Sequence, residues 1–107
     1  MFALVPPGAA LPEDVDPVAT VREDEGLTLV VSQREADAAG LAYEAPQAWI
    51  TLRVHSSLAA VGMTAAVSAA LTQAGISCNV VAGVHHDHIF VPLDRGDEAR
   101  RVLAGLR

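Results

Sequence analysis

The chain contains no lysine and only one cysteine, and it has no long apolar run. The lack of lysine removes Schiff-base chemistry and the phosphate-binding P-loop from consideration. The single Cys78 cannot form an internal disulfide, and its position on the apolar face of a predicted strand favours a buried side chain over a reactive thiol. No apolar stretch approaches the roughly 20 residues that cross a bilayer, so we expect no membrane partner.

The start of the chain also lacks the basic region and the apolar core of a signal peptide, which predicts a cytoplasmic protein. Charge is unevenly distributed, because residues 1–44 carry nine acids and two arginines whereas residues 45–107 carry four acids and five arginines. The net charge is therefore −7 for the first segment and +1 for the second, or −6 in total. No basic face with interleaved aromatic residues is present, so we expect no nucleic-acid partner.

Residues 48–107 show a clear succession of strand and helix patterns. From Ala48, apolar residues alternate with others as in a strand, and Ile50, Leu52 and Val54 lie on its apolar face. An alanine-rich helix over residues 58–75 follows, with apolar positions three and four residues apart and Gly75 at its end. These positions are Met63, Val67, Ala70, Leu71 and Ala74. A hairpin and a last helix come next, so the predicted order over residues 48–107 is βαββα.

The hairpin is predicted over residues 76–93, with one apolar face and a polar turn at residues 85–88. The residues expected to share its apolar face are Ile76, Cys78, Val80, Ala82, Val84, Ile89, Val91 and Leu93. We expect Asp94 or Asp97 to cap the last helix. The buried stripe of that helix is predicted to be Ala99, Val102, Leu103 and Leu106.

Both helices are predicted to cover the same face of this sheet, because a right-handed crossover places the first of them there. The opposite face, which we call the open sheet face, mixes polar and aromatic side chains. It comprises Trp49, Thr51, Arg53, His55, Ser77, Asn79, Val81, His88 and Phe90. Such a face suits a covering partner or a ligand, so we expect a homodimer formed through this face or through edge strands.

Residues 1–47 are predicted to follow a reduced version of the same plan. Residues 2–5 form a short strand, and a loop broken by prolines stands where a helix would belong. Residues 18–22 and 27–32 form a hairpin about a turn at residues 23–26, and a helix over about residues 33–39 ends at Gly40. The two halves are alike in the order of their elements rather than in sequence identity.

On these elements, and on the strings GMTAAVSAALTQAGIS and ISCNVVAGVHHDHIFVPL, the chain resembles the ACT-domain family. It is similar to small stand-alone bacterial proteins in which a degenerate ACT unit, here residues 1–47, precedes a complete one, here residues 48–107. Arginine sensors of the CASTOR type belong to the same broader group. Over the first half the resemblance depends on VATVREDEGLTLVV before a short helix.

The resemblance implies an α+β, ferredoxin-like fold in each complete unit. It also implies a non-enzymatic regulatory protein that needs no cofactor. Such a protein would bind an amino acid or a similar small metabolite where two units or two subunits meet.

Family effectors contact the loop between the first strand and the first helix, and the second strand of the paired unit. The residues of this chain at those positions are His55, Ser56, Ser57, Val61, Gly62, Met63, Asn79 and Val80. Free N–H groups at a helix start attract a carboxylate, Gly62 permits close approach, and Asn79 suits an amino or amide group. The alternative is that Ser56 or Ser57 caps the helix and that Gly62 relieves a tight turn.

The predicted hairpin turn contains His85, His86, Asp87 and His88, which are all of metal-binding types. His86 and His88 would lie on one side of a strand, but a zinc site generally needs three or four ligands. We therefore favour a polar turn without metal, in which Asp87 accepts backbone hydrogen bonds. Contact between subunits and a metal site are the alternatives for these residues.

Two other functions stay open beside an amino-acid-binding regulator. One is a protein-interaction module that docks a partner on the open sheet face without any ligand. The other is a metal-binding protein, or a metal-dependent enzyme, centred on residues 85–88.

Overall fold

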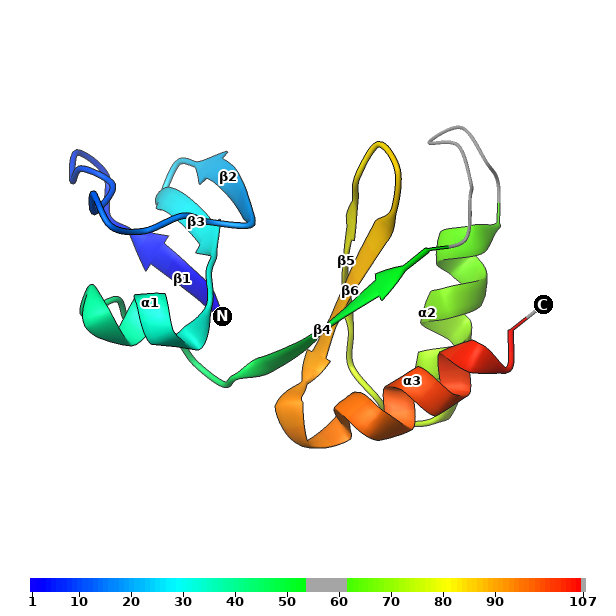
Figure 1. Cartoon of the computed structure of the whole chain (residues 1–107). Helices are drawn as coiled ribbons and strands as arrows, with labels where there is room; N and C mark the ends of the chain where they lie inside the picture. Colours follow the sequence, from blue (N-terminus) through cyan, green and yellow to red (C-terminus); the bar gives the residue numbers. More distant parts are fainter. Residues whose placement is uncertain (54–61, 107) are drawn as a thin grey trace. The chain divides into compact units, whose positions relative to one another are not determined.

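The computed structural model describes residues 1–53 and 62–106, which fall into two compact units, Met1–Pro46 and Gln47–Arg107 (Figure 1). Each unit contains a three-stranded antiparallel sheet with helical segments. This arrangement confirms the predicted α+β class. Among the described residues, no helix has the length and apolar character needed to cross a membrane.

The first unit is built on strands β1 (Phe2–Val5), β2 (Ala19–Glu23) and β3 (Gly26–Val30), followed by helix α1 (Gln33–Ala38). β3 lies in the centre of the sheet and pairs antiparallel with both neighbours. The loop between β1 and β2 contains no helix, as the prolines predicted. Gly26 is required at the β2–β3 turn, because a Cβ there would collide with the carbonyl oxygen of Val5.

A small apolar core stabilises the first unit. Ser32 begins α1 by accepting a hydrogen bond from the backbone N–H of Glu35 at 3.2 Å, and Gly40 follows the helix with φ +67°. The sheet, the β1–β2 loop and α1 all contribute apolar side chains to the core. The buried residues are Met1, Ala3, Val5, Val15, Leu29, Val31 and Ala36.

The second unit has the predicted βαββα order. Its elements are β4 (Gln47–Leu52), α2 (Met63–Gln73), β5 (Asn79–Ala82), β6 (Asp87–Pro92), a single 3₁₀ turn (Leu93–Arg95) and α3 (Gly96–Ala104). β6 is central and antiparallel to both β4 and β5, so β4 and β5 are parallel to each other and form the two edges. Residue Gly75, with φ +72°, follows α2 as predicted.

The helices of the second unit cover one face of its sheet (Figure 1). Val67 and Leu71 of α2 and Ala99 and Leu103 of α3 are buried together with residues of β6. Residues Ile50, Leu52, Cys78 and Val80 pack against this core, so their predicted orientation is confirmed. By strand alternation, the open sheet face carries Trp49, Thr51, His88 and Phe90, as predicted.

Several local predictions for the second unit were wrong. The hairpin turn occupies residues 83–86, because Ala82 already pairs with Asp87, and Val84 at its tip is exposed. Leu93 is also exposed, because the strand ends at Pro92 and a 3₁₀ turn begins. The residue that precedes α3 is Arg95, which makes no side-chain cap, so neither predicted aspartate has that role.

Candidate functional site

The structure describes two parts of the predicted ligand site, the start of α2 and the start of β5. Gly62 lies just before the helix with φ +101° and ψ −19°, a left-handed conformation that glycine adopts without steric cost. Its carbonyl accepts the N–H of Ala66 at 2.8 Å, the first hydrogen bond of the helix. Gly62 is therefore the N-cap of α2, which begins at Met63, and residues 58–61 of the predicted helix lie outside the described residues.

The first N–H groups of α2 are suited to binding an anion. Among the described residues, the N–H groups of Met63, Thr64 and Ala65 precede the first helical hydrogen bond, and Gly62 has no side chain to cap them. A Cβ built on Gly62 would have no heavy atom of the described residues within 4 Å, so these residues leave the space beside it open. The partial positive charge of the helix start favours a carboxylate there.

The other predicted site residues have different positions. The side chain of Met63 is partly buried and packs against the core. Val80 also faces the core, whereas Asn79 is exposed at the first position of β5. Residues His55, Ser56, Ser57 and Val61 lie outside the described residues.

A single copy of the unit does not bring Gly62 and Asn79 together. β5 begins shortly after the C-terminus of α2, whereas Gly62 precedes its N-terminus (Figure 1). The 11 residues of α2 span about 16 Å along the helix axis. A site that includes both residues therefore needs a second unit or a second subunit.

The histidines of the hairpin occupy different environments. His85 and His86 lie in the turn, and their rings are 6.4 Å apart. His88 lies within β6, where Nδ1 accepts the indole N–H of Trp49 at 3.0 Å and lies 3.2 Å from the hydroxyl of Thr51. Among the residues that the structure describes, no three histidine, cysteine or acidic side chains are grouped so that they could hold a metal ion.

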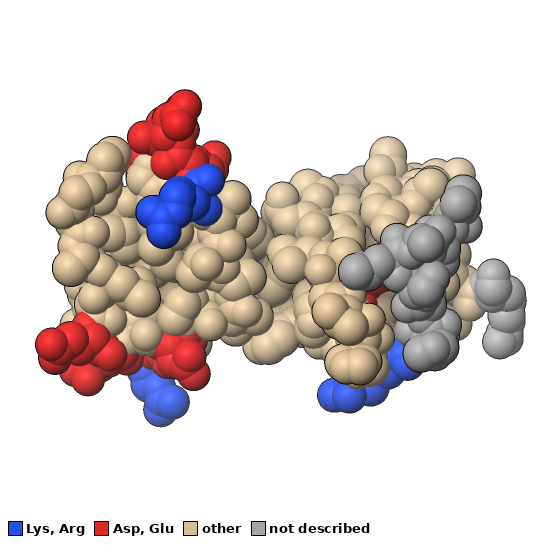
Figure 2. All heavy atoms as spheres, turned by 90° about the horizontal axis from the view of Figure 1, so that it is seen from above, with Lys and Arg blue, Asp and Glu red and all other residues tan. Residues whose placement is uncertain are grey.

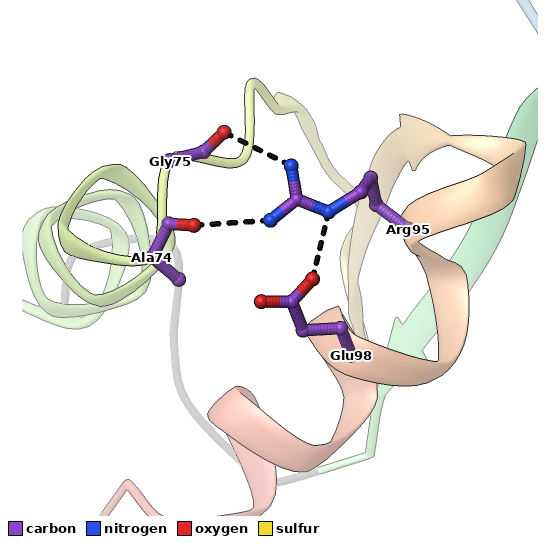
Figure 3. Close-up of polar contacts among 4 residues, drawn as sticks. All are labelled: Ala74, Gly75, Arg95 and Glu98. Atoms are coloured by element: carbon purple, nitrogen blue, oxygen red, sulfur yellow. Dashed lines mark hydrogen bonds and ion pairs between the residues drawn. The ribbon is translucent and has the colours of Figure 1, made fainter.

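The opposite end of α2 is closed by a contact that the sequence did not indicate. The guanidinium of Arg95 donates hydrogen bonds to the carbonyl oxygens of Ala74 at 3.1 Å and Gly75 at 3.3 Å (Figure 3). Its Nε donates to Glu98 at 2.7 Å, and this contact lowers the pKa of the Glu98 carboxyl and raises that of Arg95. The carbonyl groups at the C-terminal end of α2 thus accept hydrogen bonds from a cation, which the negative end of the helix dipole favours.

The first unit has a groove of about 320 Å³ between residues 12–15 and α1. Glu35, at its border, accepts the backbone N–H of Asp16 at 2.8 Å. Three of the four charged side chains lining the groove are carboxylates, and acidic side chains are prominent on the first unit in Figure 2. We therefore do not place the carboxylate of a ligand in this groove, because like charges repel.

Comparison with known families agrees with this architecture. A family model described as "ACT domain" matches residues 44–104, and a second one with the same description matches residues 1–48. The chain belongs to the ACT-domain family. ACT domains are generally regulatory modules that bind small molecules, and they are not themselves catalytic.

Two crystal structures are similar to this ACT protein. One is a protein of unknown function from Vibrio cholerae, described as a possible transport protein, with 46% sequence identity and a TM-score of 0.85 over 95% of this chain and 79% of that chain. The other is a protein from Agrobacterium tumefaciens, with 21% identity and a TM-score of 0.73 over 96% and 78% of the two chains, which shows a shared fold. No curated protein matches.

Proposed function

We propose that this ACT-domain protein is a non-enzymatic regulator that binds an amino acid or a similar metabolite at a seam between two subunits. The observation that carries the proposal is the start of α2, where no described side chain caps the backbone N–H groups and the described residues leave the space beside Gly62 open. Two further features support a seam between subunits. The first is the separation of Gly62 from Asn79 within one unit. The second is that the edge strand β5 contains neither a charged residue nor a proline.

β5 is well suited to pair with a second copy of itself. It is an edge strand of sequence NVVA, with no charged residue and no proline to discourage pairing. Antiparallel pairing of two β5 strands about a two-fold axis would form one continuous six-stranded sheet. The helices of both copies would then cover the same face of that sheet.

The same pairing unites the two halves of the predicted site. The start of α2 lies toward the end of the unit where β5 finishes at Ala82 (Figure 1). An antiparallel partner places its Asn79 beside that end. Gly62 of one subunit and Asn79 of the other would therefore border each of two equivalent sites. A zwitterionic ligand would place its carboxylate at the N–H groups of α2 and its polar end toward the Asn79 amide.

A thermal-shift screen with the twenty amino acids tests ligand binding. A ligand at about 100 times its dissociation constant should stabilise the protein by about 2.7 kcal/mol, which is a shift of several degrees. Gly62→Val should abolish this shift, because the β-branched side chain fills the open space and cannot easily adopt φ +101°.

Gly75→Val is the matched control for strain. Gly75 lies at the other end of α2, also has positive φ, and also has no heavy atom within 4 Å of a built Cβ. This variant should be destabilised but should retain the ligand-induced shift. If no amino acid shifts the melting temperature, or if Gly62→Val binds as well as the parent, the proposed ligand site is wrong.

The β5 seam is tested by sedimentation of two arginine variants. Val81 and Thr51 both face the open sheet face and both lie opposite His88, but Val81 is on β5 and Thr51 is on β4. Val81→Arg should convert the dimer to a monomer, because like charges would meet across the two-fold axis, whereas Thr51→Arg should remain dimeric. Dissociation of both variants would point to the open sheet face as the interface. A parent that stays monomeric with ligand would favour an interaction module.

A further inference from the structure

The open sheet face of the second unit contains a histidine with two competing hydrogen-bond partners on one ring atom. Nδ1 of His88 lies 3.0 Å from Nε1 of Trp49 and 3.2 Å from Oγ1 of Thr51. The rings of Trp49 and His88 have centroids 5.6 Å apart and are tilted by 58°. Cross-strand register holds the three residues together, because Thr51 lies opposite His88 and Trp49 lies opposite Phe90.

The chemistry of these groups fixes the proton positions in the observed arrangement. An indole N–H can only donate, so Nδ1 of His88 must be the acceptor and the neutral ring carries its proton on Nε2. When the ring takes a second proton, Nδ1 becomes a donor and can no longer accept from Trp49. The Thr51 hydroxyl can accept as well as donate, so it can take the hydrogen bond that the protonated Nδ1 then offers.

We propose that Trp49, Thr51 and His88 form a protonation switch on the open sheet face. In the neutral state the indole is bound to His88, and in the protonated state His88 is bound to Thr51 and the indole is released. Trp49 is 52% exposed, so this exchange changes the largest aromatic side chain that the second unit presents to a partner. Histidine is the residue type that ordinarily changes charge between about pH 5 and 8.

Side chains of β4 and β5 surround His88 on the open sheet face. Gly83, on the turn after β5, lies beside the ring, because a Cβ there would be in ordinary contact with Nε2 at 3.5 Å. The other strand side chains facing the same side are Trp49 and Thr51 on β4, Asn79 and Val81 on β5, and Phe90 on β6. Among the described residues, the other groups near this face that can carry a charge are His86 in the turn and Arg53 just after β4. Asp87 points to the other face.

The test follows the indole ¹H–¹⁵N resonance of Trp49, the only tryptophan of the chain, as the pH is varied. The resonance should follow a single titration between about pH 5 and 8. His88→Asn keeps an acceptor near the position of Nδ1 but cannot be protonated, so the titration should disappear. Thr51→Val removes the acceptor for the protonated ring, so the midpoint should move to lower pH. His85→Gln is the control, and its titration should match that of the parent.

Three results would overturn the switch. The first is an indole resonance that does not change over this pH range. The second is a titration that survives in His88→Asn, and the third is a Thr51→Val midpoint equal to that of the parent. The core amide resonances of Val67 and Leu71 should stay constant throughout, because a change there at the same midpoint would mean unfolding rather than a local exchange.

Discussion

Leu71→Ala is the substitution whose effect on stability follows most directly from the second unit. Leu71 is 0% exposed, and it lies on α2 in the core that α3 and β6 also line. Its carbonyl also accepts the N–H of Ile76 at 2.9 Å, which holds the chain as it leaves the helix. Truncation of Leu71 to alanine therefore leaves a cavity, because the backbone held by this hydrogen bond cannot easily move to fill it.

The expected loss is about 2–5 kcal/mol in the free energy of unfolding, which is the range for buried leucines. For a unit of this size each kcal/mol corresponds to about 4–8 °C in melting temperature, so even the lower limit is readily measured. Urea unfolding followed by the fluorescence of Trp49 provides the assay, because this single tryptophan lies on β4 of the same unit.

Leu93→Ala is the matched control, because Leu93 belongs to the same unit but is 56% exposed. Its stability should stay within about 0.5 kcal/mol of the parent, as for ordinary surface substitutions. If Leu71→Ala and Leu93→Ala have the same unfolding midpoint, the core described for the second unit is wrong.

Two predictions concern the pH dependence of stability. The Tyr43 hydroxyl donates to Asp37 at 2.6 Å, and this bond raises the pKa of Tyr43 above its ordinary value of 10.0. This hydrogen bond should contribute fully to stability below pH 10, and its contribution should disappear as the pH rises through the raised pKa of Tyr43. In Tyr43→Phe, unfolding at alkaline pH should lose this dependence. The contact with Arg95 lowers the pKa of Glu98 below 4.5, so its contribution should be present above that pH and disappear as the pH falls through the lowered value. Acid unfolding of Glu98→Gln should lack this step.

Local patterns in the sequence were sufficient for most of the fold. The strand at residues 2–5 and the helix ending before Gly40 were predicted because apolar alternation and a positive-φ glycine are local signals. The faces of α2 and α3 were predicted for the same reason. The shifted hairpin turn was not, because alternation continues through Val84 in the sequence while the ladder closes at Ala82 and Asp87.

Contacts between residues far apart in the sequence could not be predicted from local patterns. The hydrogen bonds from Arg95 to the carbonyl groups at the end of α2 were not predicted, because Ala74 and Gly75 are about twenty positions earlier in the chain. Trp49 and His88 are 39 positions apart, and only the register of β4 and β6 brings their rings together. The separation of Gly62 from Asn79 likewise became visible only when the direction of α2 relative to β5 was known.

A complementation experiment with two binding-deficient variants tests the proposed seam most directly. If Gly62 and Asn79 act from different subunits, Gly62→Val and Asn79→Ala should each fail to bind the amino acid that stabilises the parent. Mixing the two variants and allowing subunits to exchange should restore binding, because each mixed dimer contains one seam with both residues intact. Calorimetry of the mixture should therefore show binding that neither variant shows alone. A mixture that binds no better than the separate variants would contradict a seam built from two subunits.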